Sequence, residues 1–162
     1  MKLDLDLIDY FSYKITNMYT GLLHLHNTLR WVVLIALILS IYKLFTNKDA
    51  LKTSKTLLMS AHASLLVGLY QYIAGPLGIK MIQSAGMAAT MKDSASRFWA
   101  VEHAFSMILA IVLITIGHIK YKKTLKPNPT RIFYVIALIL ILLAMPWPFR
   151  AGIGRPLFPG MG

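Results

Sequence analysis

The sequence predicts an all-α integral membrane protein in which four helices cross the bilayer as one bundle. Of its 162 residues, 57% are hydrophobic, and the mean hydropathy is +0.61, well above that of a soluble domain of this length. Four segments are apolar over about the 20 residues that a bilayer core of roughly 30 Å requires of a helix. They are residues 20–45, 55–76, 97–119 and 131–147, and we expect residues 1–162 to form a single transmembrane domain.

The boundaries of the first two helices follow from local composition. Residues 1–17 precede the first apolar run, and we expect them to form a short N-terminal extension at the membrane interface. Gly75 and Pro76 end the second helix. The connection that follows includes Met81 to Met91, where we expect a short helix lying at the interface.

Prolines set the limits of the last helix. Pro127 and Pro129 separate the third helix from the fourth, and Pro146 and Pro148 stop the fourth. Residues 148–162 then form a tail rich in proline, aromatic and arginine residues. We expect this tail to fold back over the outer mouth of the bundle.

The formal net charge of +11 is carried largely by the connections between helices. The short connections after the first and third helices are basic, which by the positive-inside rule places both in the cytoplasm. Both termini then lie on the outer, periplasmic side of a cell inner membrane. Since the basic residues do not gather with aromatics on one soluble face, we expect the lipid bilayer as partner and no nucleic acid. The basic residues of the two connections are Lys43, Lys48, Lys52, Lys55, Lys120, Lys122, Lys123, Lys126 and Arg131.

Cysteine is absent, which excludes disulfides, thiolate metal sites and covalent attachment of a c-type haem. Any cofactor must be held by histidine, methionine or carboxylate. Thioethers are soft ligands for Cu(I), but of Met81, Met87 and Met91 only the last two share a helical face. The sequence therefore does not favour copper.

Ionisable residues inside the first and third helices are the strongest functional signal. His26 and Arg30 lie in the first helix, and Glu102 and His103 begin the third. Each charge in a bilayer segment costs about 2.5–3.5 kcal/mol on insertion scales, so such residues are usually used. All four lie at a similar depth below the outer surface, and we expect an Arg30–Glu102 pair if these helices are neighbours. The pair then either serves a site or fixes the packing of the helices.

The histidines differ in their suitability as ligands. His26 and His103 match in depth, whereas His62 lies toward the cytoplasmic half of the second helix. His24 points to a different face from His26 and is a competing ligand or an interface residue. We expect His118, at the cytoplasmic end of the third helix, to be a solvated interfacial histidine.

Two further features suit either a flat cofactor or simple packing. Small residues follow His103 along one face of its helix, including Ala110 and Gly117, as a macrocycle or a close helix contact requires. Arg150 and Arg155 in the tail are suited to haem propionates, since guanidinium binds carboxylates through paired hydrogen bonds. The alternative for the tail is an interfacial anchor that contacts lipid phosphate.

Several motifs along the chain carry a family resemblance. They are Met18-Tyr-Thr-Gly-Leu-Leu-His-Leu-His-Asn-Thr-Leu-Arg-Trp31, Ser60-Ala-His62, Gly75-Pro-Leu-Gly78, Arg97-Phe-Trp-Ala-Val-Glu-His103 and Pro146-Trp-Pro-Phe-Arg150. Together they resemble a family of small bacterial four-span membrane proteins that are often labelled cytochrome b-like, and the resemblance extends over nearly all of the chain after Asn17. A more distant similarity is to the four-helix units of haem A synthase and cytochrome b561-type proteins, in which histidines hold b-type haem.

Three functions from different classes are consistent with these residues. The first is a haem-b-binding electron carrier between a membrane donor such as quinol and an outer-face partner, with His103 and His26 as axial ligands and His62 as the alternative second ligand. The second is a cofactor-free accessory subunit or assembly factor, bound to other membrane subunits or to a second copy. The third is a quinone-binding or small-substrate enzyme with Glu102 and His103 as acid and base. We expect a carrier or a subunit rather than a stand-alone enzyme.

Overall fold

The computed structural model describes the backbone of residues 2–158, and between residues 2 and 15 it describes only the side chains of Leu7, Tyr10, Tyr13 and Lys14. All regular secondary structure in residues 2–158 is helical. Four spans are long and apolar enough to cross a membrane, namely Thr16–Phe45, Leu51–Ala85, Ser94–Thr124 and Pro127–Ala144. The chain is therefore a multi-pass membrane protein, and this part of the sequence prediction is confirmed.

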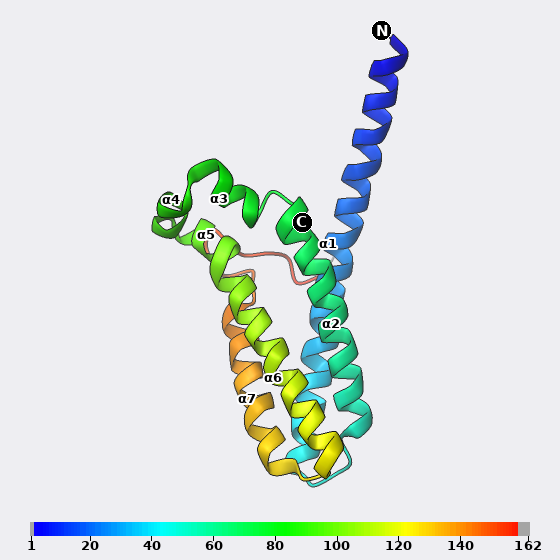
Figure 1. Ribbon diagram of the computed structural model, residues 1–162, viewed down its shortest axis with the longest axis vertical. Helices are drawn as coiled ribbons and strands as arrows, with labels where there is room; N and C mark the ends of the chain where they lie inside the picture. The colour runs from blue at the N-terminus through cyan, green and yellow to red at the C-terminus, as the bar shows by residue number, and fades with distance from the viewer. Residues whose placement is uncertain (1, 159–162) are drawn as a thin grey trace.

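Four long helices form the bundle: α1 (Lys2–Phe45), α2 (Leu51–Ala74), α6 (His103–Thr124) and α7 (Pro127–Ala144). The helices α1 and α6 each pack against both α2 and α7, so α1 and α6 lie diagonally across the bundle (Figure 1). At one end, short connections join α1 to α2 and α6 to α7, and we call this the hairpin end. The opposite end, the tail end, carries the short helices and the C-terminal tail.

The first helix is longer than the sequence indicated. It is one continuous helix of 44 residues, so residues 2–17 extend the first membrane helix and do not form a separate segment. At about 1.5 Å per residue, this helix is far longer than a bilayer core is thick. Its N-terminal part projects beyond the rest of the bundle (Figure 1).

The other boundaries differ from the expected ones by a few residues, for local reasons. The helix α2 begins at Leu51, and α7 begins at Pro127, since proline is tolerated in the first turn where its missing N–H is not needed. The helix α7 ends at Ala144, before the expected limit at residue 147. Met145 precedes a proline and is extended, as residues before proline usually are.

Short helices form the connection at the tail end. They are α3 (Ile79–Ala85), α4 (Met87–Lys92) and α5 (Ser94–Arg97), where one interfacial helix was expected. Gly86 separates α3 from α4 with φ of +79°, a conformation that glycine adopts without strain. A π-helical turn, η1 (Phe98–Glu102), then leads directly into α6.

Side chains from α6 and α7 satisfy the helix termini at the hairpin end. Arg131 donates two hydrogen bonds to the carbonyl oxygen of Leu44, at 2.7 and 3.1 Å, and one to Asn47 Oδ1 at 2.8 Å. The Tyr121 hydroxyl accepts from the backbone N–H of Ala50 at 3.1 Å. These bonds satisfy groups that lie outside the helical ladder and hold the two hairpins together.

His118 is not the solvated residue that the sequence indicated. It is only 7% exposed, and its Nδ1 lies 2.8 Å from the hydroxyl of Ser54, which also bonds the hydroxyl of Tyr134. This buried network links α2, α6 and α7. The spacing in the sequence indicates this burial, because His118 lies four residues after Ile114 on the same buried face of α6.

Gly117 allows α6 to approach α7 closely. A Cβ added there would lie 2.6 Å from the ring of Tyr134, which is fully buried. We therefore expect Gly117→Ala to destabilise the bundle by about 1–3 kcal/mol through overpacking. The matched control is Gly21→Ala, since no atom lies within 4 Å of a Cβ there. Thermal unfolding in detergent should show a lower midpoint for the first variant alone, and equal midpoints would contradict the close contact.

Candidate functional site

The end of α7 has carbonyl oxygens that the backbone of the helix cannot satisfy. Residues 142 and 144 would normally accept from the N–H groups four residues later, but those positions are Pro146 and Pro148, which have none. The indole N–H of Trp147 donates to the Leu142 oxygen at 2.9 Å. The oxygen of Ala144 therefore remains available to another helix.

His103 satisfies the carbonyl of Ala144. Its Nδ1 lies 2.8 Å from that oxygen, and a carbonyl only accepts, so Nδ1 carries the proton. The neutral imidazole then has a free lone pair on Nε2. The ring also lies 5.8 Å, centroid to centroid, from those of Phe98 and Trp99. Its orientation is thus fixed from two sides.

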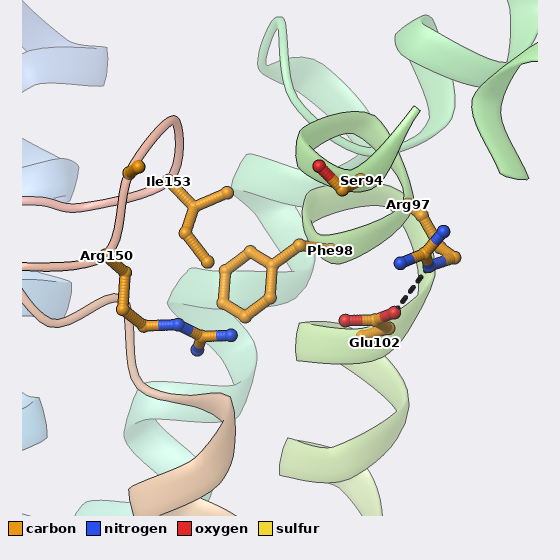
Figure 2. Close-up of a pocket in the computed structure, with 7 residues that line it drawn as sticks. Ser94, Arg97, Phe98, Glu102, Arg150 and Ile153 are labelled. Carbon is orange, nitrogen blue, oxygen red and sulfur yellow. Dashed lines mark hydrogen bonds and ion pairs between the residues drawn. The ribbon is translucent and has the colours of Figure 1, made fainter. Parts of the chain in front are cut away.

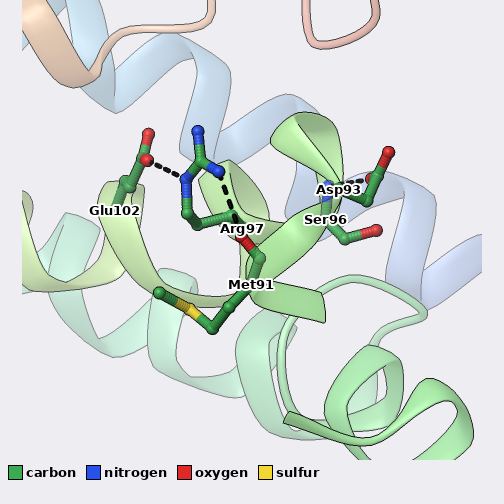
Figure 3. A network of polar contacts seen from close by, with 5 residues as sticks. All are labelled: Met91, Asp93, Ser96, Arg97 and Glu102. Carbon is green, nitrogen blue, oxygen red and sulfur yellow. Dashed lines mark hydrogen bonds and ion pairs between the residues drawn. The ribbon is translucent and has the colours of Figure 1, made fainter. Parts of the chain in front are cut away.

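Glu102 does not pair with Arg30, and this expectation from the sequence was wrong. Its Oε1 accepts from Arg97 Nε at 2.7 Å (Figure 3), and the two side chains are 46% and 36% exposed. In the π-helical turn the backbone bonds join residues five apart, as between His103 N–H and the Phe98 oxygen. This geometry brings residues 97 and 102 onto one face. It turns Glu102 toward the outside of the bundle.

Arg30 binds the C-terminal tail. Its Nη2 donates to the carbonyl oxygens of Leu157 at 2.6 Å and Pro156 at 3.2 Å. The indole of Trp31 donates to the same Leu157 oxygen at 2.8 Å and stacks on Phe158. Because α1 and α6 are diagonal, the tail replaces Glu102 as the partner of this arginine. Residues 159–162 of the tail lie outside the described residues.

His26 faces the interior of the bundle at the same end. Its Nδ1 lies 3.4 Å from the Ser64 hydroxyl. The ring packs against α2 at Gly68, where an added Cβ would lie 3.0 Å from His26 Cε1. Tyr72, one turn further along α2, donates a hydrogen bond to the π-helical turn η1, which leads directly to His103. His26 and His103, on diagonal helices, therefore lie at the same end of the bundle.

Buried polar atoms without partners occur on α1 and α2. Within residues 2–158, they are Asn27 Oδ1, Arg30 Nε and Gln71 Nε2, together with Ser40 Oγ deeper in α1. A buried polar atom without a hydrogen bond costs about 1–3 kcal/mol. Three such atoms on α1 and α2 in this part of the bundle suit a polar group or a water molecule as partner.

The other two candidate histidines lie on the lipid-facing surface. His24 and His62 are both exposed. His62 Nδ1 lies 2.9 Å from the carbonyl oxygen of Leu58 on its own helix. The structure therefore does not bring either residue to the histidine pair.

Arg150 and Arg155 lie at the tail end without carboxylate partners, since Arg97–Glu102 is the ion pair that the described side chains form. Arg150 Nη1 donates to the Leu143 oxygen at 2.9 Å, and its guanidinium lies 4.7 Å from the ring centroid of Phe98. Arg155 lies over Trp99 at 5.1 Å. Figure 2 shows Arg150 and Glu102 at the sides of a hollow of about 320 Å³.

Asp93 caps α5 beside this hollow. Its Oδ2 accepts from the backbone N–H of Ser96 at 2.7 Å (Figure 3). Hydrogen bonds from the side chain and the backbone of Ser96 lower the pKa of Asp93. The carboxylate is therefore ionised at neutral pH, and the cap is lost only as the pH falls through this lowered pKa.

Sequence reasoning missed several residues that build the site. Ser64 and Gly68 receive His26, and Trp31 holds the tail. The hydroxyl of Tyr72 donates to the Ala100 oxygen within the π-helical turn at 2.8 Å. Trp31 directly follows the charged Arg30, and Gly68 lies four residues after Ser64, which places both on one face of α2.

Comparison with known proteins identifies no relative of this chain. Against protein-family models, curated proteins and solved structures, nothing matches this chain significantly. The function must therefore be argued from the site itself.

Arg30 and Glu102 should differ sharply when each is neutralised. Arg30→Met removes two hydrogen bonds from a charged donor to the tail, and such bonds are worth roughly 1.5–3 kcal/mol each. We expect limited proteolysis of the tail to accelerate at least roughly tenfold, while Glu102→Gln leaves the rate unchanged because its partner is the exposed Arg97. The cleavage is followed by mass spectrometry. Equal acceleration in both variants would indicate that Arg30 pairs with Glu102 after all.

Proposed function

We propose that this protein is a haem-b-binding membrane protein that carries electrons between a quinol-class donor in the membrane and a partner at its tail end. The observation that supports this most strongly is that His26 and His103 lie at the same end of the bundle on diagonal helices, with His103 Nδ1 bonded to Ala144. A ligating imidazole uses one nitrogen for the metal and donates the other N–H to a carbonyl or carboxylate. The donor set therefore fits a bis-histidine haem.

Each residue of the site has a separate role in this proposal. His103 and His26 would hold the iron through Nε2, and Ser64 would orient the ring of His26. The haem supplies one-electron redox chemistry when bound. Arg150 and Arg155 have no carboxylate partner among the described side chains, and their charge suits the two propionates.

The orientation in the membrane is part of the same proposal. Lysines gather in the connections at the hairpin end, such as Lys48 between α1 and α2 and Lys126 before α7. By the positive-inside rule this end lies in the cytoplasm. The tail end and both termini would then face the periplasm of a bacterial inner membrane, and the electron partner would dock there.

An absorbance spectrum tests the haem directly. We expect the detergent-purified protein, expressed with ample haem, to show a Soret band and sharp α and β bands on reduction, as bis-histidine ligation gives. His103→Ala and His26→Ala should each remove the low-spin spectrum, because each deletes one axial ligand. His24→Ala is the matched control, since His24 is exposed, and it should retain the spectrum.

A colourless wild-type protein under these conditions removes the haem proposal. The second candidate is then favoured, a cofactor-free subunit or assembly factor of a larger membrane complex. The projecting part of α1 supports it, since Leu7 and Tyr13 are 56% and 69% exposed there. For this second candidate we expect a stable partner that copurifies with the colourless protein and stays bound to the His26→Ala and His103→Ala variants.

A further inference from the structure

A second, smaller feature lies on the lipid-facing surface between α2 and α6. It is a shallow groove of about 290 Å³. Apart from His62 and Thr115, its lining is aliphatic. The Thr115 hydroxyl donates to the Ile111 oxygen on its own helix at 2.7 Å. His62 is thus the distinctive polar group of the groove.

The hydrogen bonding of His62 fixes what this group offers. Nδ1 lies 2.9 Å from the carbonyl oxygen of Leu58, so Nδ1 carries the proton. Nε2 is then a lone-pair acceptor, and no partner for it occurs among the residues that the structure describes. His62 lies near the middle of α2, Leu51–Ala74, at the depth of the hydrocarbon core. An acceptor left unpaired there costs free energy, because lipid chains have no donor.

The groove therefore suits an occupant that is apolar but carries a hydroxyl donor. A quinol meets both requirements, since its aromatic head carries O–H groups and its isoprenoid chain is fully apolar. The oxidised quinone has carbonyl oxygens instead and cannot donate to Nε2. We propose that this groove binds the head of a membrane quinol, with one quinol hydroxyl donating to His62 Nε2.

The groove also lies close, along α2, to the residues that contact His26. Ser64, two residues from His62, lies against His26, and Gly68 receives the ring of His26. Gly68 is six residues along α2 from His62, or about 9 Å at 1.5 Å per residue. This inference rests on the proposed function for its role as the electron-donor site, although binding itself does not require the haem.

The test is a nitrogen-15 NMR titration of histidine-labelled protein in lipid nanodiscs. The probe is decyl-ubiquinol kept reduced, and His62→Leu assigns the His62 resonance. We expect a saturable shift of His62 Nε2 with quinol and none at exposed His24, which is the internal control. The dimethyl ether of the same quinol, which lacks hydroxyl donors, should give at least tenfold weaker binding. Val112→Trp should abolish the shift by filling the groove while the His62 resonance remains.

Several outcomes would overturn the quinol site. They are no saturable shift, an equal shift with the dimethyl ether, an unchanged shift in Val112→Trp, or a shift that follows protein concentration because a second copy covers the groove. The Soret band is recorded on the same samples. Its absence alongside a saturable shift would refute the haem proposal only, and its presence without a shift would refute the quinol site only.

Discussion

Pro146 and Pro148 have no amide hydrogen, and the structure of the tail end depends on how these two missing donors are replaced. The carbonyl oxygens of Leu142 and Ala144 are left outside the helical ladder, and side-chain donors replace the missing N–H groups. Trp147 supplies one donor, and His103 from α6 supplies the other. A requirement of the backbone thereby fixes the tautomer and orientation of the histidine that the proposed site needs.

The π-helical turn η1 makes the second contribution. It places Arg97 and Glu102 on one exposed face, so the carboxylate is paired outside the bundle while the next residue, His103, faces inward. Because Glu102 pairs with Arg97, its carboxylate does not occupy the inner side of α6, and Arg30 holds the tail. His26 and His103 then lie at the same end of the bundle on diagonal helices.

The sequence predicted the coarse architecture because membrane spans are long, apolar and separated by prolines and charges. It also indicated that His26 and His103 share a depth. It could not show that η1 is π-helical, since no local residue type dictates a fifth-residue bond, or that α1 and α6 are diagonal. The Arg30–Glu102 pair was wrong for both reasons. His118 was misjudged from its lysine neighbours, although its spacing from Ile114 placed it on the buried face. The proline motif was noticed, but its effect on the carbonyls four residues earlier was not.

Haem binding at this site requires His26 and His103 to face each other across the bundle, and cysteine cross-linking measures this directly because the chain has no cysteine of its own. The variant His26→Cys/His103→Cys is treated in nanodiscs with a short bifunctional thiol reagent, alongside His26→Cys/Glu102→Cys. We expect an intramolecular cross-link in the first pair and none in the second, which differs by one residue. Cross-linking of the second pair without the first would contradict this arrangement.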